Sequence, residues 1–107
     1  MKYFLFTISI IFITNSYAQV YTTQNAHSHN DYEQIIPFEL AYNENFGSIE
    51  ADIHLVNGLL LVGHDKKDLL HNKNLENLYL KPLNDHFNLN RKLQLLIDIK
   101  TEPVATI

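Results

Sequence analysis

The clearest pattern in the chain is a strict alternation of apolar and polar residues over positions 48–55. Successive side chains of a β-strand point to opposite faces of a sheet, so this pattern predicts a strand with one apolar and one polar face. We therefore expect the polar members to project together from one face. These members are Ser48, Glu50, Asp52 and His54.

A hairpin is predicted directly after this strand. Asn57 and Gly58 separate the strand from an apolar run at 59–62, and Asn-Gly is a strong hairpin signal. A two-residue turn here places position 64 opposite position 51, which brings His64 beside Asp52. Strict register would aim His64 to the other face, so we expect Gly63 to bend the strand.

The remaining pattern predicts strands that alternate with helices. A short strand over 25–30 precedes a helix that begins at Pro37, with Gly47 as its left-handed stop. The polar stretch 66–90 predicts a loop with one short helix at 83–87, opened by Pro82. The run 93–100 predicts a second clear strand, and residues 101–103 resemble the start of another helix.

This alternation is typical of parallel α/β proteins. We expect the N-terminal portion of a (β/α)8 TIM barrel, in which functional groups gather where strands end. Such a barrel needs about 250 residues, whereas the chain has 107. The sequence is therefore expected to be an incomplete fragment of that fold.

The N-terminus predicts a secretory signal peptide over residues 1–18. Lys2 precedes an apolar run at 3–13, and Ser16 to Ala18 resembles a small-residue cleavage site. A membrane anchor is the alternative, but the run forms a helix only about 16 Å long, against a hydrocarbon core of about 30 Å. We expect cleavage after Ala18, a secreted or periplasmic product without a stable membrane anchor, and one domain over 19–107.

Charge and composition narrow the chemistry. The formal net charge is −4, so the chain lacks the basic surface that nucleic acid requires, and nucleic acid is not an expected partner. The chain also contains no cysteine. Any metal ion must therefore be held by carboxylates, histidines or carbonyl groups.

Two pairs of charged residues could bind a metal ion and an anion. Glu50 and Asp52 are two residues apart on one strand, so their carboxylates repel each other unless a cation lies between them. Mg²⁺ or Ca²⁺ suits such oxygen ligands. Asp98 repeats the spacing with Lys100 on the next strand, where they could supply a third ligand and a phosphate contact. The alternative for each pair is a solvated polar face.

Histidines could supply acid–base chemistry. His27 and His29 share one face of an extended segment, and His64 is expected near the carboxylates. Two imidazoles beside a metal ion and a lysine suit cleavage of a phosphodiester, because one can remove a proton while the other donates one. We expect the other three histidines to be ordinary surface or packing residues. They are His54, His71 and His86.

Four short blocks resemble a known family. They are AHSHNDY at 26–32, GSIEAD at 47–52, GHD at 63–65 and IDIK at 97–100. Together they resemble the glycerophosphodiester phosphodiesterases and, more broadly, the phospholipase-C-like phosphodiesterases with a TIM-barrel fold. The HSHNDY form is most similar to the subgroup that includes the altered-inheritance-of-mitochondria proteins.

The resemblance implies specific roles. His27 and His64 would be the acid–base pair, and Lys100 would contact the phosphate of a small-molecule or lipid-derived phosphodiester. A substrate hydroxyl would attack first, giving a cyclic phosphate that water can open. The resemblance assigns the divalent metal ion to three ligands, which are Glu50, Asp52 and Asp98.

The first block departs from the usual pattern of the family. The usual block is His-Arg-Gly, whereas Ser28 and His29 follow His27 here, so the arginine that would hold phosphate is missing. The choice between His27 and His29 as the catalytic residue stays open. Asn30 lies three residues after His27, as in the related sphingomyelinase-D-like enzymes, which favours His27 and leaves His29 and Asn30 as substrate-binding candidates.

Two other functions fit part of the pattern. His27 and His29 also resemble the metal-binding pair of amidohydrolase-like and histidinol-phosphatase-like barrels, although those enzymes need further histidine ligands downstream. The second alternative is a catalytically inactive secreted binding protein on the same fold. The missing arginine and the short chain both favour that interpretation.

Overall fold

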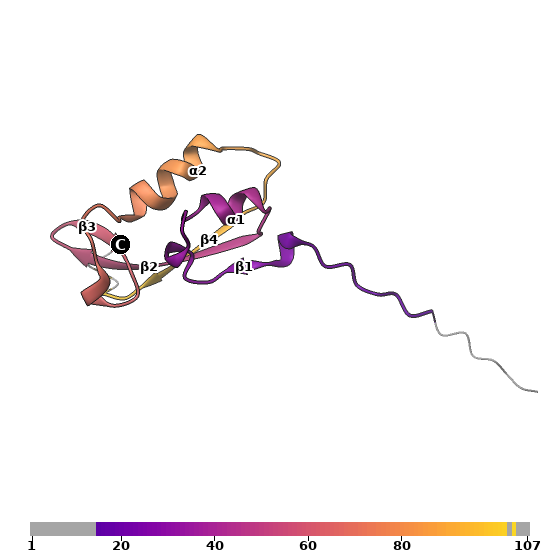
Figure 1. The fold of residues 1–107 in the computed structure, drawn as a ribbon, viewed down its shortest axis with the longest axis horizontal. Coiled ribbons are helices and arrows are strands. Elements are labelled where there is room, and N and C mark those ends of the chain that lie inside the picture. Colours follow the sequence, from indigo (N-terminus) through magenta and orange to yellow (C-terminus); the bar gives the residue numbers. More distant parts are fainter. Residues whose placement is uncertain (1–14, 103, 105–107) are drawn as a thin grey trace, which may run out of the picture.

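A four-stranded mixed sheet forms the centre of the computed structural model, which describes residues 15–102 and 104 (Figure 1). Strands β1 and β4 run parallel to the central strand β2, and β3 runs antiparallel to it. The predicted α/β class is confirmed, and the (β/α)8 barrel remains a prediction. The strands are β1 (His27–Ser28), β2 (Ser48–Val56), β3 (Leu59–Val62) and β4 (Gln94–Ile99).

The pairing of β2 explains where the polar residues gather. Strand β4 follows one edge of β2 over positions 48–53. The other edge is shared, because β1 pairs with positions 48–49 and β3 pairs with positions 53–56. Strand β1 runs parallel to β2 and β3 runs back toward it, so the carboxyl ends of both strands converge on the middle of β2.

The hairpin forms with the predicted register. Asn57 and Gly58 have φ angles of 49° and 77°, as a two-residue hairpin turn requires. Strand pairing ends at Val62, where the amide of Gly63 still donates a hydrogen bond of 3.2 Å to the Asp52 carbonyl. The chain then leaves the strand and bends at residues 64–65, directly after the expected position, so His64 is released from the alternation.

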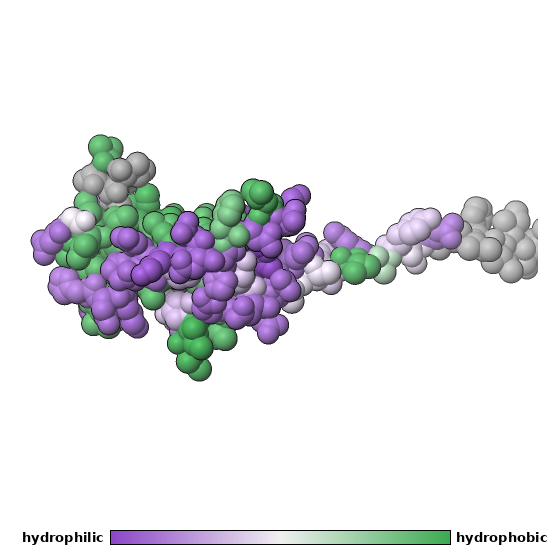
Figure 2. Space-filling model, turned by 90° about the horizontal axis from the view of Figure 1, so that it is seen from above, coloured by the Kyte–Doolittle hydropathy of each residue, from purple (hydrophilic) through white to green (hydrophobic). Residues whose placement is uncertain are grey.

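The apolar face of the sheet packs against the helical segments, which lie on one side of it (Figure 1). Ile49 and Ala51 are fully buried there, and Tyr79 is the largest buried side chain in the core. From above, hydrophilic residues cover the middle of the molecule and hydrophobic ones form separate patches (Figure 2). The helical segments are α1 (Glu39–Asn43), the π-helical η4 (Glu76–Leu80) and α2 (Lys81–Asp85).

Two details of the first predicted helix are corrected. Helix α1 is shorter than expected, and Asn45, with a φ of 59°, adopts the left-handed conformation that was predicted for Gly47. Glycine is required at position 47 for another reason. A Cβ there would lie 2.0 Å from the carbonyl oxygen of Gln24, so the close approach of two backbone segments excludes a side chain.

The short helix predicted at 83–87 is present but displaced. Helix α2 spans Lys81–Asp85 with Pro82 in its first turn, as expected, and it continues directly from η4, so the helical segment begins earlier, at Glu76. Leu75 and Tyr79, four residues apart, are both buried in the core, which explains why the helix begins earlier.

Two predictions extend beyond the described residues. Positions 1–14 of the signal peptide predicted over 1–18 lie outside them, and so do parts of the helix predicted from 101–103. In the described part of the chain, no helix has both the length and the apolar character needed to cross a membrane.

Candidate functional site

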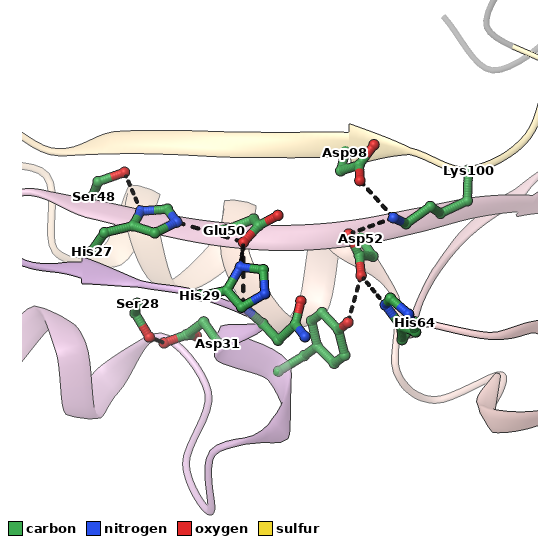
Figure 3. Close-up of polar contacts among 12 residues, drawn as sticks. His27, Ser28, His29, Asp31, Ser48, Glu50, Asp52, His64, Asp98 and Lys100 are labelled. Atoms are coloured by element: carbon green, nitrogen blue, oxygen red, sulfur yellow. Dashed lines mark hydrogen bonds and ion pairs between the residues drawn. The ribbon is translucent and has the colours of Figure 1, made fainter.

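Two buried carboxylates on β2 form the centre of the candidate site (Figure 3). The side chains of Glu50 and Asp52 are 11% and 2% exposed, and both project from the polar face of the strand. Asp52 pairs with Asp98 in the parallel register of β4, which also places Lys100 nearby. The predicted site residues from β2 and β4 therefore meet on one face.

The carboxylate of Glu50 contacts the segment that leaves β1. Its Oε2 atom lies 3.5 Å from Nε2 of His27 and also contacts Nδ1 of His29. The backbone amide of Asn30 donates to the same oxygen at 3.4 Å. On its other side, the His27 ring places Nδ1 2.9 Å from the hydroxyl of Ser48. Both candidate histidines of the first block therefore lie at the same carboxylate.

The carboxylate of Asp52 lies at the other end of the site, near the residues that follow the β2–β3 hairpin; we call this the hairpin end. Its Oδ2 accepts a hydrogen bond of 2.6 Å from the hydroxyl of Tyr32 and lies 3.0 Å from Nδ1 of His64. Its Oδ1 lies 3.5 Å from the ammonium of Lys100, which is also 2.6 Å from Asp98. The predicted approach of His64 to Asp52 is confirmed.

The surroundings of Asp52 keep it ionised. Burial alone would raise the pKa of its carboxyl, but the hydrogen bonds from Tyr32 and His64 and the charge of Lys100 outweigh it and lower the pKa. Burial and the hydrogen bond to Asp52 raise the pKa of Tyr32, so this hydroxyl remains a donor. The hydrogen bond to Asp98 raises the pKa of Lys100, which stays positively charged.

A buried network that the sequence did not predict holds the loop after β1. Asp31 is fully buried and accepts hydrogen bonds of 2.6 Å from the Ser28 hydroxyl, 2.6 Å from the amide of Phe38 and 2.9 Å from the Tyr79 hydroxyl. The sequence alone does not distinguish Asp31 from the other polar residues of its loop. The one sequence signal for this network is the four-residue spacing of Leu75 and Tyr79, which indicates that Tyr79, a donor to Asp31, is buried.

The three other histidines match their expected roles, and one also supports the site. His54 is buried, with Nε2 3.1 Å from the carbonyl of Gly63 and 3.2 Å from that of His64. Carbonyl oxygens only accept, so this nitrogen carries the proton and holds the turn that carries His64. His86 contacts Glu39 and packs against Tyr42, and His71 is exposed.

Two groups of side chains in the described part of the chain could hold a metal ion. In each group the ligand atoms lie within 4.8 Å of one another, and Glu50 belongs to both. Glu50, Asp52 and Asp98 offer only oxygens, which fits Mg²⁺ or Ca²⁺. His27, His29 and Glu50 offer two nitrogens and one oxygen.

Accessible side chains surround the two buried carboxylates on the polar face of the sheet. The side chains of His29, His64 and Asp98 are 71%, 54% and 47% exposed, although the carboxylates between them are buried. Buried anions beside accessible imidazoles and an ammonium form a site where a ligand with both negative and proton-accepting groups can bind.

The chain is similar to known phosphodiesterase domains. The sequence profile of the AIM6-like phosphodiesterase domain matches residues 15–105. The Altered inheritance of mitochondria protein 6 homolog of Arthroderma benhamiae is 44% identical over 63 residues, which cover 53% of this chain and 20% of that protein. Altered inheritance of mitochondria protein 6 of Eremothecium gossypii is 41% identical over 59 residues, which cover 53% of this chain and 15% of that protein.

The matched relatives are much longer than the matched region. The chain spans about a fifth or less of their length. No solved structure matches the chain significantly.

Proposed function

The chain belongs to the AIM6-like phosphodiesterase domain family, and we propose that the protein is a secreted, metal-dependent phosphodiesterase. Its substrates would be glycerophosphodiesters or phospholipid-type phosphodiesters. One observation supports this proposal above the others. The buried carboxylates Glu50 and Asp52 lie side by side, with imidazoles at both ends and Lys100 beside them.

His64 would act at the hairpin end of the site. The carboxylate of Asp52 can only accept a hydrogen bond, so Nδ1 of His64 carries the proton and Nε2 of the neutral ring is left free. Such a ring can take a proton from a hydroxyl or, once protonated, return one. Asp52 thus fixes the ring orientation.

A second imidazole would act at the β1 end. We assign this role to His27, whose ring is held between Ser48 and Glu50, and assign substrate binding to the more exposed His29 and to Asn30. One imidazole takes the proton of the attacking hydroxyl as the new P–O bond forms. The other donates a proton to the leaving oxygen as the ester P–O bond breaks.

Charge on the open face would stabilise the reacting phosphate. The ammonium of Lys100 would attract its oxygens as negative charge develops. Glu50, Asp52 and Asp98 would hold Mg²⁺ or Ca²⁺, which supplies further positive charge to the phosphate when bound. In the structure the ammonium of Lys100 lies against two of these carboxylates, Asp52 and Asp98.

An assay of the full-length protein tests this proposal. We expect hydrolysis of a chromogenic phosphodiester or of a glycerophosphodiester with Mg²⁺ or Ca²⁺, and its loss in excess chelator. His27→Ala is expected to lower kcat about 10²- to 10⁴-fold, whereas His29→Ala raises KM. The exposed His71→Ala is the matched control.

The result could favour another function. Metal binding with no turnover on a broad panel of phosphodiesters would favour the inactive binding protein. Hydrolysis of amides or phosphomonoesters in their place would favour the amidohydrolase-like or histidinol-phosphatase-like alternative.

A further inference from the structure

We propose that His27, His29 and Glu50 form a second cation site, selective for a transition-metal ion such as Zn²⁺ or Co²⁺. It shares Glu50 with the all-oxygen group but uses two imidazoles in place of two aspartates. The binding itself does not depend on the proposed phosphodiesterase activity.

The strand register brings the three ligands together. His27 pairs with Ser48 in the parallel register of β1 and β2. Two residues further along, His29 lies in the turn just after β1 and Glu50 lies in β2, and the two side chains meet. Nε2 of His27 and Nδ1 of His29 both face Oε2 of Glu50. Zinc bonds to nitrogen and oxygen are about 2.0–2.2 Å long. Two ligands of one ion then lie within about 4 Å of each other, which agrees with the 3.5 Å between His27 and Glu50.

The hydrogen bond to Ser48 is an independent observation that supports the site. Metal-binding histidines usually donate the proton of their other ring nitrogen to a neighbouring acceptor, which fixes the tautomer and the ring orientation. The hydroxyl of Ser48, 2.9 Å from Nδ1 of His27, is placed to accept that proton when Nε2 binds an ion. Nε2 of the ring faces the carboxylate of Glu50 at 3.5 Å, so an ion bound there would replace a proton shared between the two groups.

The ligand types determine which ion the site prefers. Imidazole suits Zn²⁺ and similar transition metals, whereas Mg²⁺ and Ca²⁺ prefer oxygen. Three protein ligands also leave coordination positions free, and the open face admits water or substrate there, because the His29 and His27 side chains are 71% and 40% exposed. The two groups therefore separate hard ions from transition-metal ions on one face of the sheet.

A consequence for activity rests on the proposed function. A transition-metal ion bound to His27 removes that imidazole from acid–base work and competes for Glu50. We therefore expect Zn²⁺ to inhibit the hydrolysis supported by Mg²⁺ or Ca²⁺.

Titration of the metal-free full-length protein with Co²⁺ tests the site without any substrate. We expect visible d–d absorption bands and a measurable Kd for the wild type. His29→Ala removes one ligand from an exposed position and should weaken binding at least about tenfold, since even the loss of an outer partner costs that much. His71→Ala is the exposed control, and Asp98→Asn should keep the Co²⁺ spectrum because it alters only the all-oxygen group.

Three outcomes would overturn the site. They are no spectral change in the wild type, unchanged Co²⁺ affinity in His29→Ala, or loss of the spectrum in Asp98→Asn but not in His29→Ala. The activity measurement is read separately. Intact Co²⁺ binding without inhibition by Zn²⁺ would contradict the catalytic role of His27 and leave the cation site standing.

Discussion

Asp31 and Asp52 are both buried carboxylates, but the hydrogen-bond donors of Asp31 are buried, whereas some donors of Asp52 are exposed to solvent. Asp31 faces the core side, where the Ser28 hydroxyl, the Phe38 amide and the Tyr79 hydroxyl that bind it are buried with it. Asp52 faces the open side of the sheet. Among its donors, His64 and Lys100 reach solvent, with side chains 54% and 29% exposed.

We propose that this difference separates a carboxylate that serves the fold from one that serves a ligand. A buried acceptor with only buried donors is costly to disturb, because each donor loses its partner. An acceptor whose donors are accessible can exchange them for a substrate or an ion at little cost to the fold. Substitutions around Asp31 should therefore lower stability, and substitutions around Asp52 should lower activity.

The largest expected effect is on the open side. His64→Ala should lower kcat/KM for a phosphodiester about 10²- to 10⁴-fold, because it removes an acid–base group. The midpoint of urea unfolding should stay the same, since the side chain is half exposed. Steady-state kinetics and urea unfolding of one preparation check both results. Unchanged turnover would remove His64 from the mechanism.

The next effect is on the core side. Asp31→Ala should lower the free energy of unfolding by about 3–5 kcal/mol, because it leaves three buried donors without a partner. Urea unfolding measures this loss. Glu33→Ala, an exposed acidic residue two positions away, is the control and should change stability little. Equal stability of the two variants would contradict the structural role of Asp31.

A pair of tyrosines gives a sharper comparison. Tyr79→Phe removes a buried hydrogen bond to Asp31 and should cost about 1–2 kcal/mol of stability. Tyr32→Phe removes the corresponding bond to Asp52 on the open side. It should cost less stability but lower kcat/KM at least about tenfold, as expected for a partner that orients a functional group. A larger loss of stability in Tyr32→Phe, or a larger loss of activity in Tyr79→Phe, would contradict the distinction between the two carboxylates.

The smallest effect concerns alkaline pH. Burial and the nearby Asp31 raise the pKa of Tyr79, whereas the unfolded side chain titrates near its ordinary value of about 10. The folded state then binds more protons, so the stability from Tyr79 is complete below about pH 10 and is lost as the pH rises above it. In Tyr79→Phe the free energy of unfolding should therefore fall less steeply as the pH rises. The increase in tyrosinate absorbance on unfolding should also be smaller. An identical pH dependence would contradict this shift.

Local pattern predicted the strands and the hairpin well. The alternation at 48–55 and the Asn57–Gly58 turn place β2 and β3 in register, and that register brings Asp98 and His64 to Asp52. Such elements are predictable because one strand or turn contains the whole signal.

The errors have a common physical cause. Gly47 is required by the carbonyl of Gln24, and the early start of the 76–85 helical segment follows from burial of Tyr79. The network of Asp31 joins three parts of the chain. Contacts between distant segments determine each of these features, and the local pattern contains only the four-residue spacing of Leu75 and Tyr79.

The most direct test of the central claim is the rate of phosphodiester hydrolysis by full-length wild type and its Glu50→Gln variant. This variant keeps the size of the side chain but removes the charge shared by both cation groups. We predict a wild-type turnover that chelator stops, and a loss of about 10²-fold or more in the variant at an unchanged melting temperature. Equal turnover by the two proteins, or none by the wild type on any phosphodiester, would contradict the account.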